Sequence, residues 1–420
     1  MIWTPDACIP AALRYKDGLP AAHFLPLTEE TRVTRSIVDP AVGTLTHRER
    51  FRRVMHFQTV DRIPHWEFGY LDETIARWHK EGLPPQYNDN YTVERYFGVD
   101  PTAWVPFHDA LLPGFEGPVE VLEVKENARV ERLPDGTVQE VQTSGVKTIP
   151  HFIKMPIANR DDWLRFKERL GPDDPRRFET DYEALGRRLL RSEAPVGTGL
   201  GSYYGIPRNW IGFHNISLML YDDRPLLEEI VATLGQVYYR QIEAGLRHCE
   251  VDFAGGWEDI CSRAGPMISP GMFREIVGPH LKRVCSLLRQ HGCSVIWTDC
   301  DGDVTQLVPV WLECGVNCMF PLEVHPGSDP VKYRRMWGRD ILLRGGVAKH
   351  QLAFGKKEIL KELRRVEPVV EEGGFIPHGD HRIPEDVPYN NYRYYVREKL
   401  KMLGWRDDEI AQVEPLKGLK

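Results

Sequence analysis

The sequence lacks the features expected of a nucleic-acid-binding, membrane-spanning or secreted protein. Its 54 basic side chains are outnumbered by 61 acidic ones, and no basic stripe is present to offset repulsion from phosphates. No apolar run in the sequence approaches the roughly 18 residues needed to cross a bilayer. The first residues, MIWTPDACIPAALRYKDG, contain neither a basic n-region nor a continuous apolar h-region. We therefore expect no secretory signal and a cytoplasmic protein.

Cysteine is scarce, and its spacing is irregular. Seven of the eight cysteines fall between Cys249 and Cys318, yet no two of them form a CxxC pair. In a chain of 420 residues this pattern favours reduced thiols over a disulfide framework. We expect most of these cysteines to be small core residues.

No GxGxxG fingerprint follows the first expected strand, which disfavours an open nucleotide-binding sheet. The chain instead repeats a unit in which a short apolar run is followed by a turn and then by an amphipathic helical stretch. Thr46 and Ser269 are the expected N-caps of two of these helices. Some eight strands alternating with helices predict a (β/α)8 TIM barrel. The expected strands are 63–69, 102–108, 194–202, 251–257, 294–299, 315–323, 340–347 and 373–379.

The chain divides into an arm, a barrel and an insertion. Residues 1–45 are rich in Pro, Ala and Thr and show little periodicity, so we interpret them as an N-terminal arm. The barrel is expected over residues 46–410. Residues 118–157 alternate in period two around an Asp135-Gly136 turn, which is typical of a hairpin. This β-rich insertion is expected either to cover the barrel mouth or to build a dimer contact.

A catalytic barrel carries its active groups at the carboxyl-terminal ends of its strands. Acids, histidines and aromatic residues concentrate at these positions of the sequence, which a purely structural barrel would not need. They are Glu67, Tyr70, His108, Asp109, Ser202, Tyr203, Tyr204, Trp257, Glu258, Asp259, Asp299, Asp301, Glu323, His325, Lys349, His350, His378, Asp380 and His381.

The stretch SVIWTDCDGDVTQLV places three carboxylates within five residues at the end of one expected strand. Asp299 and Asp301 are two apart and face the same way, and a cation between them would stabilise the pair. Glu323 and His381 would complete a four-ligand site suited to zinc, manganese or iron. The alternative is that the aspartates pair with arginines, that Asp303 caps the following helix and that His381 is a core histidine.

A second acidic pair, Glu258 and Asp259, precedes a turn in GGWEDICSRAGP. In a loop both side chains can enter the barrel mouth, where one would act as a general acid or base. A salt bridge within the loop is the alternative.

Five segments, in this order, resemble the uroporphyrinogen decarboxylase superfamily over about residues 46 to 403. They are RERFRRVMHFQTVDRIPHWE, WEDICSRAGPMISPGMFREIVGPHLKRV, DGDVTQLVPVWLECGVNCMFPLEV, LLRGGV and GGFIPHGDHRIPEDVPYNNY. The resemblance implies a (β/α)8 barrel, often homodimeric, with one of two chemistries. One is cofactor-free decarboxylation of porphyrinogen acetate arms. The other is zinc-dependent methyl transfer to or from a corrinoid or a thiol.

The motifs of the two branches match this chain unequally. Decarboxylases of the superfamily carry Arg-Gln-Ala-Gly-Arg after the first strand, where this chain reads HWEFGY with Glu67. An acid there repels a polycarboxylate, and Asp109 is only a loose counterpart of the catalytic aspartate. The corrinoid methyltransferases hold zinc with His-x-Cys, a later cysteine and an acid. The resemblance implies Asp299, Asp301, His381 and Glu323 at these places, a harder donor set without thiolates.

The leading hypothesis is therefore a metal-dependent, methyltransferase-like enzyme acting on a small methylated substrate. Glu258 or His378 would move a proton, while Trp257, Tyr203 and Tyr204 would pack the substrate and Glu67 would contact it. No DxHxxG segment is present, so a corrinoid would arrive on a partner protein. One alternative is a cofactor-free decarboxylase of a porphyrinogen or another carboxylated ring, with Asp109 stabilising a protonated intermediate. The other is a non-catalytic barrel that binds a ligand.

Overall fold

The computed structural model describes residues 36–107, 115–144 and 150–418. Most of the predicted N-terminal arm, residues 1–35, lies outside this part of the chain. The described part of the arm contains a short 3-10 helix, Pro40–Val42, and a bridge between Val38 and Val60. Within the described residues, no helix is long and apolar enough to span a membrane.

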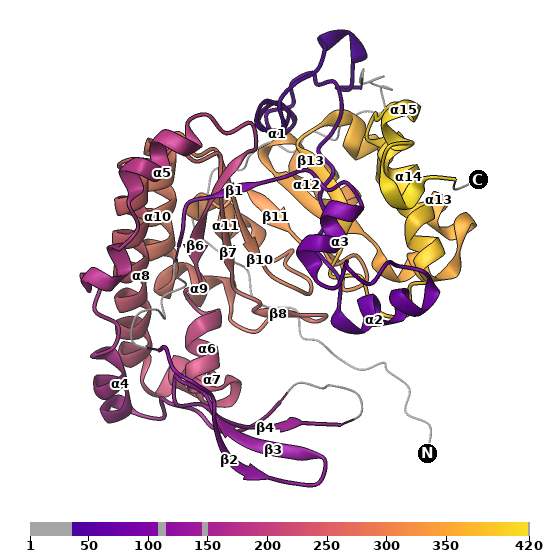
Figure 1. Cartoon of the computed structure of the whole chain (residues 1–420). Coiled ribbons are helices and arrows are strands. Elements are labelled where there is room, and N and C mark those ends of the chain that lie inside the picture. Colours follow the sequence, from indigo (N-terminus) through magenta and orange to yellow (C-terminus); the bar gives the residue numbers. More distant parts are fainter. Residues whose placement is uncertain (1–35, 108–114, 145–149, 419–420) are drawn as a thin grey trace, which may run out of the picture. The chain divides into compact units, whose positions relative to one another are not determined.

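A curled sheet of seven parallel strands forms the centre of the fold, consistent with a TIM-like barrel (Figure 1). Seven of the eight predicted strands pair in it, in the spatial order β1-β6-β7-β10-β11-β12-β13. Glycines and prolines bound the apolar runs from which they form, as the sequence predicts. The strands are β1 Ala103–Trp104, β6 Val196–Gly201, β7 Phe253–Trp257, β10 Val295–Asp299, β11 Cys318–Phe320, β12 Leu342–Val347 and β13 Phe375–Gly379.

The eighth predicted strand, 63–69, is wrong as a strand. The segment is extended but forms no ladder, and its neighbour Tyr70 makes only an isolated parallel bridge to Ile383. A side chain replaces part of the missing ladder, because Lys399 Nζ donates to the carbonyl of Trp66 at 2.7 Å. The segment therefore runs beside β13 without extending the sheet.

Helices follow most strands, as a parallel sheet requires for its crossovers. Thr46 and Ser269 cap their helices as predicted, each side chain accepting from a backbone N–H three residues on. The helices are α1 His47–Met55, α2 Asp72–Glu81, α3 Asn90–Tyr96, α4 Arg160–Lys167, α5 Tyr182–Leu189, α6 Gly205–Ile211, α7 Phe213–Asp222, α8 Arg224–Leu246, α9 Pro270–Ile276, α10 Gly278–Gln290, α11 Val308–Cys314, α12 Pro330–Trp337, α13 Lys356–Glu372, α14 Tyr389–Met402 and α15 Asp407–Ile410.

The segment predicted as a β-rich insertion forms a separate antiparallel sheet between β1 and α4. Its order is β2-β3-β4-β5, and the Asp135-Gly136 turn joins β3 to β4. The strands are β2 Glu120–Val124, β3 Ala128–Arg132, β4 Val138–Gln142 and β5 His151–Lys154. A two-stranded hairpin, β8 Cys261–Ser262 with β9 Gly265–Pro266, follows β7.

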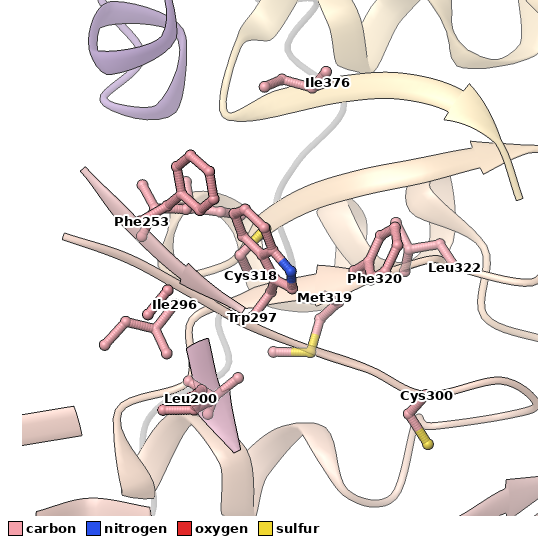
Figure 2. Packing of buried hydrophobic residues seen from close by; sticks show 14 of the residues in the cluster. Leu200, Phe253, Ile296, Trp297, Cys300, Cys318, Met319, Phe320, Leu322 and Ile376 are labelled. Carbon is pink, nitrogen blue, oxygen red and sulfur yellow. The ribbon is translucent and has the colours of Figure 1, made fainter. Parts of the chain in front are cut away.

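Aromatic rings fill the inside of the curled sheet. Phe253 and Trp297, from neighbouring strands, stack with ring centroids 4.7 Å apart, as Figure 2 shows. Trp66, from the extended segment, lies edge-on to Phe253 at 5.9 Å, and Phe51 of α1 stacks on Trp66 at 5.2 Å. These contacts join the helix that begins the fold to the middle of the sheet.

A fully buried ion pair fixes the extended segment to the last long helix. Lys399 of α14 contacts Glu67 at 2.7 Å, and both side chains are 0% exposed. The carboxylate of Glu67, which the sequence suggested as a substrate contact, is instead paired with Lys399. Its charge is neutralised inside the fold, where an unpaired carboxylate would be strongly destabilising.

We expect Lys399→Met to lower the free energy of unfolding by about 3–5 kcal/mol, because it leaves the Glu67 carboxylate buried without a partner. The double variant Glu67→Gln/Lys399→Met should recover most of this loss. Urea unfolding followed by circular dichroism measures both. Lys401→Met, at an exposed position of the same helix, serves as the control and should change stability by less than about 0.5 kcal/mol. Equal stability of the Lys399 and Lys401 variants would contradict a role for the pair.

Candidate active site

Acidic and basic side chains meet where the parallel strands end. Asp299, the last residue of β10, lies in register with Trp257 at the end of β7 and with Phe320 at the end of β11. The turns that follow these strands, together with α6 and the segments after β12 and β13, supply the other members. We call the set the strand-end cluster: Asp259, Asp299, Asp301, Glu323, Asp380, Arg208, Lys349 and His381.

Asp299 is the carboxyl group of the cluster whose protonation is most clearly altered. Burial, together with the charge of Asp301, raises its pKa to about 7 against the opposing effects of His381 and Arg344. The pKa of a free aspartate is about 3.9, so this group is far more basic than usual. Near neutral pH it exists as a mixture of acid and carboxylate, which suits a group that donates a proton.

Asp301 and His381 form an ion pair across the cluster. Asp301 Oδ2 lies 3.3 Å from His381 Nε2, and the ring of Phe68 packs edge-on against the imidazole at 5.1 Å. Burial alone would lower the pKa of His381, but the hydrogen bond and charge of Asp301 outweigh it and the pKa is raised. The other oxygen of Asp301, Oδ1, is buried and has no hydrogen-bond partner among the described residues.

Glu323 is neutralised by a lysine. Lys349 Nζ lies 2.9 Å from Glu323 Oε1 and 3.6 Å from Asp380 Oδ1, and the backbone N–H of Gly302 donates to Glu323 Oε2 at 3.0 Å. Asp380 also accepts the backbone N–H groups of Val324 and Lys349. Lys349 thus links the residues after β11, β12 and β13.

Arg208 of α6 accompanies Asp259 on the opposite side of the cluster. Its Nη2 lies 3.6 Å from Asp259 Oδ2, its Nη1 donates to the Asp259 carbonyl, and its guanidinium lies 5.5 Å from the ring of Trp257. Asp259 adopts a left-handed backbone with φ of 45°, which turns the chain sharply after β7. Sequence reasoning missed Arg208, because nothing in a helical segment marks which arginine faces the neighbouring strand end.

Trp257 lines a small cavity between the ends of β6 and β7, with a volume of about 200 Å³. Contact of its ring with a substrate stays a prediction. The other lining residues are Gly201, Ser202, Ile206, Tyr238, Gly255 and Gly256.

Glu258 has a structural position, contrary to its expected catalytic role. Its side chain is only 2% exposed and accepts three backbone N–H groups, from Tyr203 at 2.7 Å and from Tyr204 and Gly205 at 2.9 Å. These donors are the unsatisfied amides at the start of α6. Tyr203 and Tyr204 are themselves buried, and the Tyr203 hydroxyl donates to the Leu200 carbonyl. None of the three side chains is placed to contact a substrate.

His378 also lies inside the barrel rather than in its mouth. It is fully buried, its Nδ1–H donates to the Gly379 carbonyl at 2.8 Å, and its Nε2 accepts from Arg344 Nε at 3.2 Å. Burial, together with the nearby charges of Arg344 and Lys399, holds its pKa well below the usual range. The imidazole is neutral and has both nitrogens engaged, so proton transfer to a substrate is not its role. Asp109 and His108 lie outside the described residues.

Asp303 does not cap the helix predicted to follow it. Its carboxylate accepts from the backbone N–H of Thr305 at 2.9 Å, whereas α11 begins only at Val308. The aspartate instead closes a turn between the strand end and the helix.

The four predicted metal ligands converge only in part. Asp301 is paired with His381, and Glu323 is paired with Lys349, a cation that competes with a metal for the same oxygen. Across the described part of the chain, no group of three or more His, Cys, Asp or Glu side chains is arranged to hold a metal ion. The donor set also lacks the thiolates of the zinc enzymes that the sequence resembles. The residues present do not fit a metal site in this arrangement.

Together, the parallel sheet and the charged strand-end cluster define an α/β protein of barrel type with a candidate active site at its mouth. Residues 138–399 match the sequence profile of the family described as uroporphyrinogen decarboxylase (URO-D), and the chain belongs to this family. No curated protein sequence matches it significantly.

Among solved structures, the fold is similar to a methyltransferase from Methanosarcina mazei. The TM-score is 0.53 at 13% sequence identity, and the match covers 85% of this chain and all of the other (100%). At this identity the similarity concerns the fold alone.

We expect Asp301→Asn to lower the pKa of His381 to below about 6.5, the usual value for histidine, because burial then acts without the opposing carboxylate. In the parent protein, the interaction of protonated His381 with Asp301 stabilises the fold. This stabilisation is fully present below pH 6.5 and is lost as the pH rises through the pKa that His381 has in the folded state. The variant should lose this pH dependence. NMR titration of the histidine ring nitrogens measures the change.

Asp303→Asn is the matched control for this titration, because Asp303 bonds Thr305 and is not among the groups that shift His381. It should leave the His381 titration unchanged. An unchanged titration in Asp301→Asn as well would show that the ion pair does not exist in solution.

Proposed function

We propose that this URO-D family protein is a methyltransferase-like enzyme that acts on a small methylated compound, with Asp299 as its proton donor. The observation that carries the proposal is the position of Asp299: a carboxyl group with a pKa of about 7, at a strand end, surrounded by other acids. Fold similarity to a methyltransferase is consistent with it.

The charge of the strand-end cluster favours this substrate class over a porphyrinogen. The cluster has five acids against three groups that carry positive charge, and each of the three cations already pairs with one of the acids. A substrate with many carboxylates would be repelled, whereas a neutral or cationic methylated amine or ether would not. Glu67, where decarboxylases of this family place arginines, is already neutralised by Lys399.

The proposed role of Asp299 is to protonate the nitrogen or oxygen that leaves the methyl group, because the unprotonated heteroatom is a poor leaving group. The bond between the methyl carbon and its nitrogen or oxygen breaks, and both electrons stay on the heteroatom. The proton of Asp299 is transferred to that heteroatom as the methyl carbon joins a nucleophilic acceptor. Asp299 becomes a carboxylate and is reprotonated from solvent. General acid catalysis of this kind contributes roughly 10²- to 10⁴-fold in rate.

The methyl acceptor is expected on another protein. The chain contains no DxHxxG segment, so a corrinoid would be carried by a partner. When bound, the corrinoid supplies a strongly nucleophilic cobalt centre for the methyl group. Asp301 and His381 hold the wall of the site beside Asp299, while Trp257 and Phe68 offer aromatic surface to the substrate. We derive no step from a metal, because the predicted ligands are paired in other ways.

The second candidate is decarboxylation of a small carboxylated ring, which the family assignment favours. In that reaction the carbon–carboxylate bond breaks, carbon dioxide leaves, and Asp299 protonates the carbon that retains the electron pair. The same residue would serve both reactions, so the products distinguish them. A barrel that only binds a ligand would give neither product.

We expect Asp299→Asn to reduce kcat by roughly 10²- to 10⁴-fold with little change in KM, since the amide has no proton to give. The parent rate should fall as the pH rises through about 7, because the donor must be protonated. The assay incubates the enzyme with a panel of methylated amines and methoxyarenes and with free reduced cobalamin as acceptor, and follows methylcobalamin by absorbance.

Asp303→Asn, which alters an acid of the same segment outside the cluster, should retain the parent rate. Release of carbon dioxide from a carboxylated ring, with no methylcobalamin formed, would overturn methyl transfer and establish the second candidate. Full activity of Asp299→Asn would remove Asp299 from either mechanism.

A further inference from the structure

A cavity of about 140 Å³ lies inside the curled sheet, apart from the strand-end cluster. Its walls come from the extended segment, α3, the loop between α3 and β1, and the strands β1, β7, β10 and β12, and it has room for about four or five waters at roughly 30 Å³ each. Trp104, one of its lining residues, is 49% exposed. The lining residues are Trp66, Glu67, Glu94, Val99, Asp100, Thr102, Trp104, Phe253, Trp297 and Arg344. Two of the three acids among them are already paired with cations, Glu67 with Lys399 and Asp100 with Arg62.

Arg344 brings a positive charge into this cavity of aromatic and acidic side chains. Its guanidinium lies over three aromatic rings, at 4.4 Å from Phe320, 4.8 Å from Trp297 and 5.0 Å from Trp66. Its Nε donates to His378 Nε2 at 3.2 Å. The described residues give it no carboxylate at ion-pair distance, and the two Nη groups have no recorded hydrogen bond there.

Other arginines of the fold differ from Arg344 in having hydrogen-bond or ion-pair partners for their Nη groups. Arg334, which is buried whereas Arg344 is half-buried, donates to the carbonyls of Gly338, Ile341, Gly373 and Gly374. Arg62 and Arg48 each pair with a buried aspartate. Burying a cation without an anion is costly, and aromatic faces offset only part of that cost. Arg344, by contrast, lines a cavity and has no recorded partner for its Nη groups among the described residues, which leaves these donors available to a ligand.

Glu94 does not supply the missing counter-charge. It lines the same cavity but forms no ion pair with Arg344, and burial together with the charge of Glu67 raises its pKa to about 7 against the opposing charge of Arg344. In its acid form Glu94 can donate a hydrogen bond to an anion rather than repel it.

We propose that this cavity binds one small carboxylate, with the Nη groups of Arg344 donating to its two oxygens and the aromatic side chains packing its carbon atoms. The guanidinium fork matches the planar carboxylate, and neutral His378 positions the fork by accepting from Nε. The volume admits only a few carbon atoms. The anion is either a free small carboxylate or the carboxylate end of the substrate, and binding to the cavity does not depend on which reaction the enzyme performs.

The test is a titration of the full-length protein with sodium acetate, against sodium chloride at constant ionic strength. Three tryptophans line the cavity, so their fluorescence reports its occupation. We expect a saturable change with acetate and none with chloride. Arg344→Met should weaken acetate binding by roughly 10- to 100-fold, since charge-assisted hydrogen bonds are lost. The exposed-arginine control, Arg335→Met, should bind acetate as the parent does.

Arg344→Lys separates charge from geometry. It keeps the charge but loses the fork, and it should bind acetate more weakly than the parent although it remains folded. Competition between acetate and a substrate identifies the source of the anion. If acetate raises the KM for the substrate, the cavity binds the carboxylate of that substrate. If acetate binds without changing this KM, the cavity binds a free carboxylate. Absence of a saturable signal in the parent, or equal binding by the parent and Arg344→Met, overturns the proposal. Neither result bears on methyl transfer.

Discussion

Charge compensation in a confined space is the constraint on which the candidate site depends. Parallel strands end at one edge of the sheet, so the acids that follow them are brought together whether or not they attract. Each acid here is stabilised by a different means. Lys349 pairs with Glu323, His381 pairs with Asp301, and Arg208 accompanies Asp259. Asp299 forms no ion pair with a described residue, and burial together with the charge of Asp301 raises its pKa.

Most of the fold could be predicted from the sequence because its strands are short apolar runs bounded by turn residues. The segment 63–69 has the same pattern yet forms no ladder. Its Trp66 carbonyl bonds the Lys399 side chain, a contact made more than 300 residues along the chain. Periodicity reports burial, which this segment shares with true strands, but it does not report which group satisfies each backbone carbonyl.

The site was predictable to a smaller extent. Asp299, Asp301, Glu323 and His381 do lie in one cluster, because strand order determines which strand ends are neighbours, but only Asp301 and His381 contact each other. Their pairing was not predictable: Lys349 was expected at a strand end but not as the partner of Glu323, and Arg208 reaches the site from a helix without a motif. For Glu258 the position was predicted but the role was not. Its place at a strand end suggested catalysis, but both of its carboxylate oxygens accept backbone N–H groups at the start of α6. Proximity to a helix start decided its role.

The strand-end cluster and the inner cavity are electrostatically linked. Arg344 lowers the pKa of Asp299, in opposition to burial, and Asp299 in turn favours the charged form of Arg344. An anion that neutralised Arg344 would remove this effect, so Asp299 would keep its proton to higher pH. By thermodynamic reciprocity, protonation of Asp299 would strengthen binding of that anion. The charge of Arg344 thus couples the occupation of the cavity to the proton held by Asp299.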